Sequence, residues 1–253
     1  RGRRLLLPLS SVALYWSGMA LNDWADRALD AVERPERPIP SGRVSPRAAL
    51  GTAVALSAAG LGLAAWAGGR DALAVAVPLT AAVWSYDTVL KDTKAGPLAM
   101  AACRALDVLL GSGRGRAAAA LPGAAVMAAH TLGVTVLAHG EVRGASPAVA
   151  RAVLGATAVT AATPVALPTR TRRHRTGALA GAVAYATTVG RAQLRVVRDP
   201  GAGTVRSATK AGVHGMVPLQ CALVAGAGST AVAAGLALVL PLVRALSRKV
   251  TPA

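Results

Sequence analysis

The sequence LNDWADRALDAVERPERPIPSGRVSP, residues 21–46, decides the fold, because it joins an apolar run to a short window rich in acids, arginines and prolines. Asn22, Asp26 and Asp30 are spaced four residues apart and would share one face of a helix, with Asp23 three residues before Asp26. Like charges at this spacing repel, and the C-terminal end of a helix dipole disfavours anions. A divalent cation would offset both costs, because carboxylate oxygens suit Mg²⁺ that also binds substrate phosphates.

The loop that follows carries Arg34, Arg37 and Arg43 among prolines and a glycine, which limit its conformations. Arginines on a stiffened loop can bind phosphate oxygens in bidentate fashion. The acidic helix end and the basic loop together predict a pocket for a diphosphate bound with a metal ion. The alternative is a solvated acidic turn whose charges are balanced by Arg27, Arg34 and Arg37.

The composition is that of a membrane protein. Of the 253 residues, 53% are hydrophobic and 15% are charged, and mean hydropathy is positive. The formal net charge of +17 comes mostly from arginines in short connections between apolar runs, with no alternation of aromatic and basic residues. This pattern favours basic membrane loops over a nucleic-acid-binding surface. The two cysteines lack CxxC spacing and indicate neither a disulfide framework nor a zinc site.

Apolar runs of the length needed to cross a bilayer recur along the whole chain. We therefore predict an all-α, polytopic transmembrane bundle of eight to nine helices, forming a single domain over residues 1–253. The predicted spans are residues 5–21, 47–67, 71–88, 96–112, 117–138, 147–168, 176–195, 212–228 and 229–247.

The connections between these spans alternate between two kinds. One kind is longer and holds many charged and polar residues, and we call these the rich loops; the other kind is short. The rich loops are residues 22–46, 87–95, 139–146 and 196–211, and the short ones lie around 68–70, 111–116 and 168–175. Because successive spans change sides, the four rich loops are expected on one membrane face. An excess of Lys and Arg there favours the cytoplasmic side, although the arginines of 168–175 lie opposite.

The second rich loop and the span after it add further candidates. Lys91 would supply a cation, and Tyr86 could flank a carbocation through its ring face or simply be an interfacial tyrosine. Arg104 and Asp107 are costly to expose to lipid and so should face the bundle interior. They could line a site or pair with each other.

These residues resemble the UbiA-type intramembrane prenyltransferases. The family's N-D-x-x-D-x-x-x-D motif is matched by Asn22, Asp23, Asp26 and Asp30, and RPERPIPSGRVSP is similar to its R-P-I-P-S-G continuation. Tyr86 and Lys91, followed by Arg104, look like its second conserved segment. The similarity extends over nearly the whole chain, with the family's first helix expected to be missing, and it looks closest to a bacterial, EboC-like branch.

The chain departs from the family pattern at a second acidic motif, D-x-x-x-D, expected after the family's sixth helix. The corresponding loop, LAHGEVRGAS, holds a single acid, Glu141, beside His139 and Arg143. Asp199 lies in a later loop and would be an auxiliary group. The departure puts a second Mg²⁺ site, and so full catalytic competence, in question.

The resemblance implies Mg²⁺-dependent transfer of a prenyl group from an isoprenyl diphosphate to a small, commonly aromatic or cyclic, acceptor in the lipid bilayer of a bacterial inner membrane. Metal ligands would be Asn22, Asp23, Asp26 and Glu141. The implied catalytic residues are Asp23, Asp26, Asp30, Lys91 and Arg104, and the substrate-binding residues are Asn22, Arg34, Arg37, Arg43, Tyr86 and Arg143. Asp30 would stabilise the loop or act near the acceptor.

Two other functions remain open on the sequence. One is a transferase that uses a polyprenyl phosphate to accept a sugar or ribose phosphate. The other is a transport or accessory protein that keeps the fold without turnover, which the reduced second acidic motif would favour.

Overall fold

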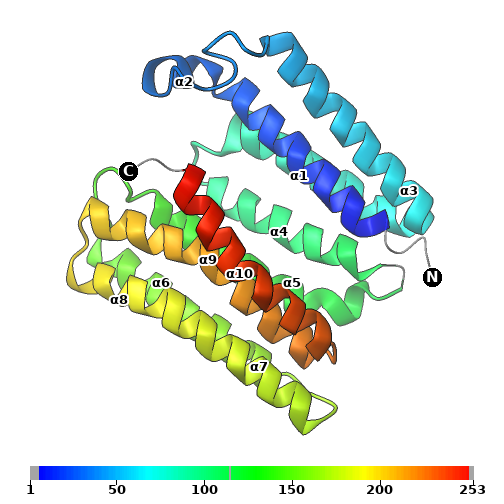
Figure 1. Ribbon diagram of the computed structural model, residues 1–253, viewed down its shortest axis with the longest axis vertical. Helices are drawn as coiled ribbons and strands as arrows, with labels where there is room; N and C mark the ends of the chain where they lie inside the picture. The colour runs from blue at the N-terminus through cyan, green and yellow to red at the C-terminus, as the bar shows by residue number, and fades with distance from the viewer. Residues whose placement is uncertain (1–5, 114, 251–253) are drawn as a thin grey trace. The chain divides into compact units, whose positions relative to one another are not determined.

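A computed structural model describes residues 6–113 and 115–250, with side chains described as far as residue 239 and at Pro241. The described residues form helices and no strand, which confirms the all-α fold class. The chain divides into two compact units, one ending at Ala124 and the other beginning at Ala125. Each unit is a set of packed helices (Figure 1).

The first unit consists of α1 (Leu6–Ala25), α2 (Arg27–Glu33), α3 (Pro46–Ser85), the π-helical turn η2 (Tyr86–Leu90) and α4 (Gly96–Ser112). The helix α3 reverses direction at Gly69, where φ is 62° and ψ is −142°. The Trp84 indole donates to Ser57 Oγ at 3.0 Å. These two residues would be about 40 Å apart along a straight helix, so α3 is a helical hairpin.

Small residues allow α1 to lie close against α3. A Cβ at Gly60 would come within 2.7 Å of the Leu14 side chain, so only glycine fits there. Hydroxyl groups also join the two helices. Ser10 Oγ donates to Gly60 O at 2.7 Å, and Ser17 Oγ donates to Ala53 O at 2.8 Å. This packing fixes the end of α1, where the acidic motif begins.

The second unit holds most of α5 (Ala117–Ala138) and all of α6 (Pro147–Ala166), α7 (Arg172–Tyr185), η3 (Ala186–Gly190), α8 (Arg191–Arg198), α9 (Ala202–Gly226) and α10 (Thr230–Val250). In its core the Tyr185 hydroxyl lies 2.9 Å from His130 Nδ1, and both side chains are buried. A Cβ at Gly181 would lie 2.5 Å from the backbone nitrogen of Ala222, so α7 and α9 touch backbone to backbone.

The two units share two local features. Ser45 and Ser146 both cap a helix that begins with proline, each accepting a hydrogen bond from the backbone N–H three residues later. Each unit also has a π-helical turn, at Tyr86–Leu90 and at Ala186–Gly190, after a long helix. Turns of this kind hold one extra residue and are frequent at functional sites.

The predicted spans correspond to helices, with two corrections to the loops. The acidic window is not a plain loop, because α2 occupies its first part. The predicted loop 196–211 is wrong in extent, because α9 already begins at Ala202. Its first turns are too polar to register as a span, but Val205 and Ala208 are buried in the second unit's core.

Three described segments are long and apolar enough to cross a membrane, Pro46–Leu90, Ala117–Ala138 and Pro147–Ala166. The first of them contains the hairpin at Gly69.

Candidate functional site

The acidic motif lies where α1 gives way to α2. The backbone hydrogen-bond ladder continues through this junction, with Asp26 N donating to Asn22 O at 2.9 Å and Asp30 N donating to Asp26 O at 2.8 Å. Arg34 N then donates to Asp30 O at 2.8 Å. Since each step is four residues, Asn22, Asp26 and Asp30 follow one another along one side of the chain.

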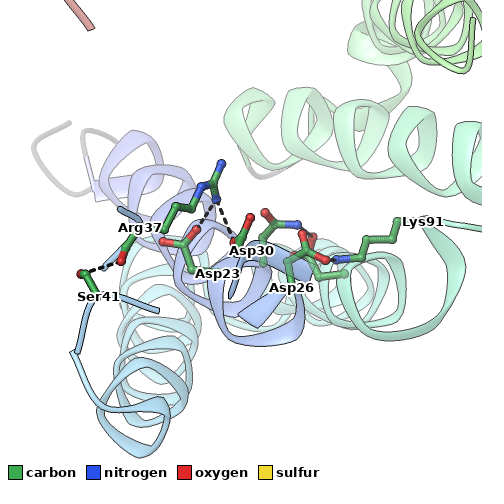
Figure 2. Close-up of polar contacts among 8 residues, drawn as sticks. Asp23, Asp26, Asp30, Arg37, Ser41 and Lys91 are labelled. Atoms are coloured by element: carbon green, nitrogen blue, oxygen red, sulfur yellow. Dashed lines mark hydrogen bonds and ion pairs between the residues drawn. The ribbon is translucent and has the colours of Figure 1, made fainter. Parts of the chain in front are cut away.

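Arg37 joins two of the acids. Its Nη1 lies 2.8 Å from Asp23 Oδ1 and 3.5 Å from Asp30 Oδ2 (Figure 2). The side chain of Asp30 is only 8% exposed, whereas those of Asp23 and Arg37 are about one third exposed. The Ser41 hydroxyl donates to Arg37 O at 2.6 Å and so holds the backbone of the proline-rich loop. The loop therefore folds back onto the acidic helix end.

Lys91 pairs with the third acid from another part of the chain. Its ammonium group contacts the Asp26 carboxylate, and both side chains are largely buried (Figure 2). The π-helical turn η2 delivers it, because Lys91 N bonds Tyr86 O, five residues back, at 2.9 Å. The first two rich loops therefore meet, as their placement on one membrane face requires.

Asp87 belongs to the same group, although sequence reasoning did not select it. It is 6% exposed, and its Oδ1 accepts a hydrogen bond from Asn22 Nδ2 at 3.5 Å. The spacing contained a signal, since Asp87 precedes Lys91 by four residues, just as Asn22 precedes Asp26.

The remaining candidates in the first unit lie in several settings. Arg104 Nη1 is 3.3 Å from Asp107 Oδ2, so these two residues pair with each other, which was one of the two alternatives considered for them. The Arg104 Nε is buried without a hydrogen-bond partner in the described part of the chain. Arg34 and Arg43 are exposed, and Arg43 donates to Glu36 O at 2.6 Å within its own loop. Their roles toward a substrate remain predictions, as does that of the half-buried Tyr86.

Glu141 and Arg143 lie in the second unit, in the loop between α5 and α6. Arg206 Nη1 donates to Glu141 O at 2.8 Å, and Ala145 N donates to Pro200 O at 2.9 Å. The other two rich loops therefore also lie together, within this unit. The assignment of Glu141 to a metal and of Arg143 to a substrate remains a prediction.

The donor atoms of the first unit suit Mg²⁺. No cluster of three or more His, Cys, Asp or Glu that could hold a metal occurs among the described residues. Mg²⁺ does not need one, because it is usually bound by one or two carboxylates together with waters and substrate phosphates. Asn22, Asp23 and Asp26 offer oxygen ligands at one helix end, and Asp30 Oδ2 is buried without a hydrogen-bond donor in the described chain.

The site is a set of three acids paired with two cations. Asp23 and Asp30 share Arg37, and Asp26 is paired with Lys91. Both cations can also bind phosphate oxygens, and each carboxylate can also bind a divalent ion. The arrangement can therefore exchange internal ion pairs for contacts with a metal-bound diphosphate.

Comparison with known proteins identifies the family. The UbiA prenyltransferase family matches residues 3–250 of the chain. A digeranylgeranylglyceryl phosphate synthase of Methanopyrus kandleri is 42% identical over 89 residues, which is 35% of this chain and 32% of the relative. The bacteriochlorophyll synthase 33 kDa chain of Rhodobacter capsulatus is 40% identical over 67 residues, which is 26% of this chain and 22% of the relative.

These similarities cover about a third or less of each of those relatives. No solved structure matches the chain. The family match, in contrast, extends over almost the entire sequence and includes the acidic helix end, the basic loop and Lys91. The chain belongs to the UbiA prenyltransferase family.

Proposed function

We propose that this protein transfers a prenyl group from an isoprenyl diphosphate, bound with Mg²⁺, to a small acceptor within a membrane. The observation that carries the proposal is the meeting of Asp23, Asp26 and Asp30 with Arg37 and Lys91 at the end of α1. Acids for a divalent ion and cations for phosphate oxygens are what a metal–diphosphate site requires.

Binding would proceed by exchange of partners. Arg37 would turn from Asp23, and Lys91 from Asp26, to the diphosphate oxygens. Asn22, Asp23 and Asp26 would hold Mg²⁺. Because Asp30 is the most deeply buried of the motif acids, it would keep Arg37 and its loop in place.

Breaking the allylic C–O bond places negative charge on the departing diphosphate and positive charge on the prenyl carbon. When bound, Mg²⁺ would stabilise the first of these charges as a Lewis acid. Arg37 and Lys91, once turned to the diphosphate, would stabilise the same charge. The Tyr86 ring could face the allylic cation, and exclusion of water by the helices would protect that cation from hydrolysis.

The acceptor is proposed only by class, as a small aromatic or cyclic molecule. The relatives are named as synthases of digeranylgeranylglyceryl phosphate and of bacteriochlorophyll, two products of different chemistry. We further propose a multi-pass protein of the bacterial inner membrane with its acidic site on the cytoplasmic face, because Lys and Arg concentrate in the rich loops.

The test is release of diphosphate from geranylgeranyl diphosphate and other isoprenyl diphosphates by purified protein in nanodiscs. We expect release with Mg²⁺, none with a chelator, and a loss of at least about a hundredfold in Asp23→Ala and Asp26→Ala, because such charges act mainly in the transition state. Asp92→Ala is the matched control, since Asp92 is an exposed acid directly after Lys91.

Donor binding that is equally tight with Mg²⁺ and with chelator, without diphosphate release, would overturn the proposal. It would favour a transport or accessory role on the same fold.

A further inference from the structure

One buried carboxylate next to the acidic motif takes no part in the proposed chemistry. Asp87 is 6% exposed and lies at the start of the π-helical turn η2. Burying a carboxylate among helices is costly unless specific partners compensate for the lost water. Its hydrogen-bond partner is the first residue of the acidic motif, Asn22, at 3.5 Å.

The contacts around Asp87 form two facing rows. Gly18, Asn22 and Asp26 follow one another at intervals of four residues on one row, and Asp87 and Lys91 do so on the other. Asn22 meets Asp87 and Asp26 meets Lys91, each pair being 65 residues apart in the sequence. Gly18 lies beside the acid, because a Cβ built there would be in ordinary contact with Asp87 Oδ2, at 3.6 Å.

The chemistry of this contact sets the orientation of the Asn22 amide. An ionised carboxylate only accepts hydrogen bonds, whereas an amide has a donating nitrogen and an accepting oxygen. The amide must therefore turn its nitrogen toward Asp87, which directs its oxygen away from the buried acid. Without such a partner the amide could flip and present its nitrogen instead.

We propose that Asp87 is a positioning residue that fixes the Asn22 side chain so that its carbonyl oxygen is available to the metal–diphosphate group. Asp87 itself would touch neither substrate nor metal. The inference rests on the proposed function for the identity of the ligand. The pairing of Asp87 with Asn22 does not depend on turnover.

The pairing is tested by exchanging the two side chains. Asn22→Asp places two carboxylates together and Asp87→Asn places two amides together, and the double variant restores one amide and one carboxylate. We expect each single variant to unfold at lower temperature or denaturant than the wild type, and the double variant to recover. If the double variant shows only the sum of the two losses, the pairing is refuted.

The functional consequence is tested with Asp87→Asn and an unreactive thio-diphosphate analogue of the donor. We expect the Mg²⁺ concentration for half-maximal analogue binding to rise about tenfold, the lower end of what loss of a residue supporting a metal ligand costs. At saturating Mg²⁺, kcat should stay near that of the wild type, because Asp87 does not contact the reacting atoms. Asp92→Asn, an exposed neighbour, should change neither value.

An unchanged Mg²⁺ requirement in Asp87→Asn would overturn the inference. So would a fall in kcat at saturating Mg²⁺ with no change in the Mg²⁺ requirement, because this would place Asp87 in the chemistry itself. If the wild-type protein binds the analogue without any need for Mg²⁺, the proposed function fails instead, and the exchange of side chains still decides whether Asp87 holds Asn22.

Discussion

Removing the guanidinium of Arg37 should destabilise the protein measurably, even without any ligand. In Arg37→Ala, Asp23 and Asp30 lose the cation that lies 2.8 Å and 3.5 Å from them. The two negative charges would then lie close together without the Arg37 cation that offsets their repulsion. Asp30 is the more affected, because it is 8% exposed and its Oδ2 has no hydrogen-bond donor in the described chain.

The magnitude follows from how deeply the group is buried. Exposed ion pairs contribute about 0–1 kcal/mol, whereas removing one partner of a buried pair costs about 3–5 kcal/mol. Arg37 is 31% exposed and Asp23 is 37% exposed, so solvent screens one of the two contacts. We therefore expect Arg37→Ala to lower the free energy of unfolding by about 1–2 kcal/mol, between these limits.

Denaturant unfolding in detergent micelles measures this loss. Arg34→Ala is the matched control, because Arg34 lies in the same segment, is exposed and forms no ion pair in the described part of the structure. Arg37→Lys should be intermediate, since it keeps the charge without the planar fork. High salt should narrow the difference only partly. Equal stability of Arg37→Ala and Arg34→Ala would refute the idea that Arg37 compensates the buried acid.

Three further predictions concern the packing of the second unit. Gly181→Ala should lower the free energy of unfolding by about 1–3 kcal/mol through overpacking. Gly155→Ala is the control and should not, because its Cβ meets no described atom within 4 Å. Equal thermal stability of the two variants would contradict this prediction. Tyr185→Phe should cost about 1–3 kcal/mol, because it removes the hydroxyl from buried His130, and an unchanged melting temperature would argue against that contact. Ser146→Ala should cost about 1 kcal/mol through loss of the helix cap, measured by denaturant unfolding and restored in Ser146→Asp.

Hydropathy and spacing were sufficient to predict most of the helices and the face carried by the acidic motif. The interval of four residues between Asn22, Asp26 and Asp30 correctly predicted that these residues lie along one side of the helical chain. The reason is that the hydrogen-bond ladder continues through the junction of α1 and α2. The turn at 68–70 was also visible as a polar break with two glycines. The start of α9 was missed, because its polar first turns are held by tertiary packing of Val205 rather than by their own apolarity.

The partners within the site could not be read from the sequence in the same way. Which acid meets Arg37 and which meets Lys91 depends on how the loop folds back and on the π-helical turn that ends the hairpin. Asp87 was overlooked because its interval of four residues to Lys91 is a weak signal by itself, and its importance comes only from its contact with Asn22. Long-range pairings of this kind are a property of the packed chain.

The π-helical turn at Tyr86–Leu90 has a consequence for changes in chain length. It holds one residue more than a regular turn requires, so deleting a single residue between Asp87 and Leu90 could be absorbed by a return to ordinary α-helix. Residues beyond the deletion would then keep nearly the same face, because the deleted residue is the one that the wider turn accommodates. A deletion in a regular α-helix would instead rotate them by about 100°. We therefore expect that losing one residue here leaves the helix intact and the lysine after the turn still aimed at the acids, whereas the same deletion in the regular part of α3 would turn that lysine away.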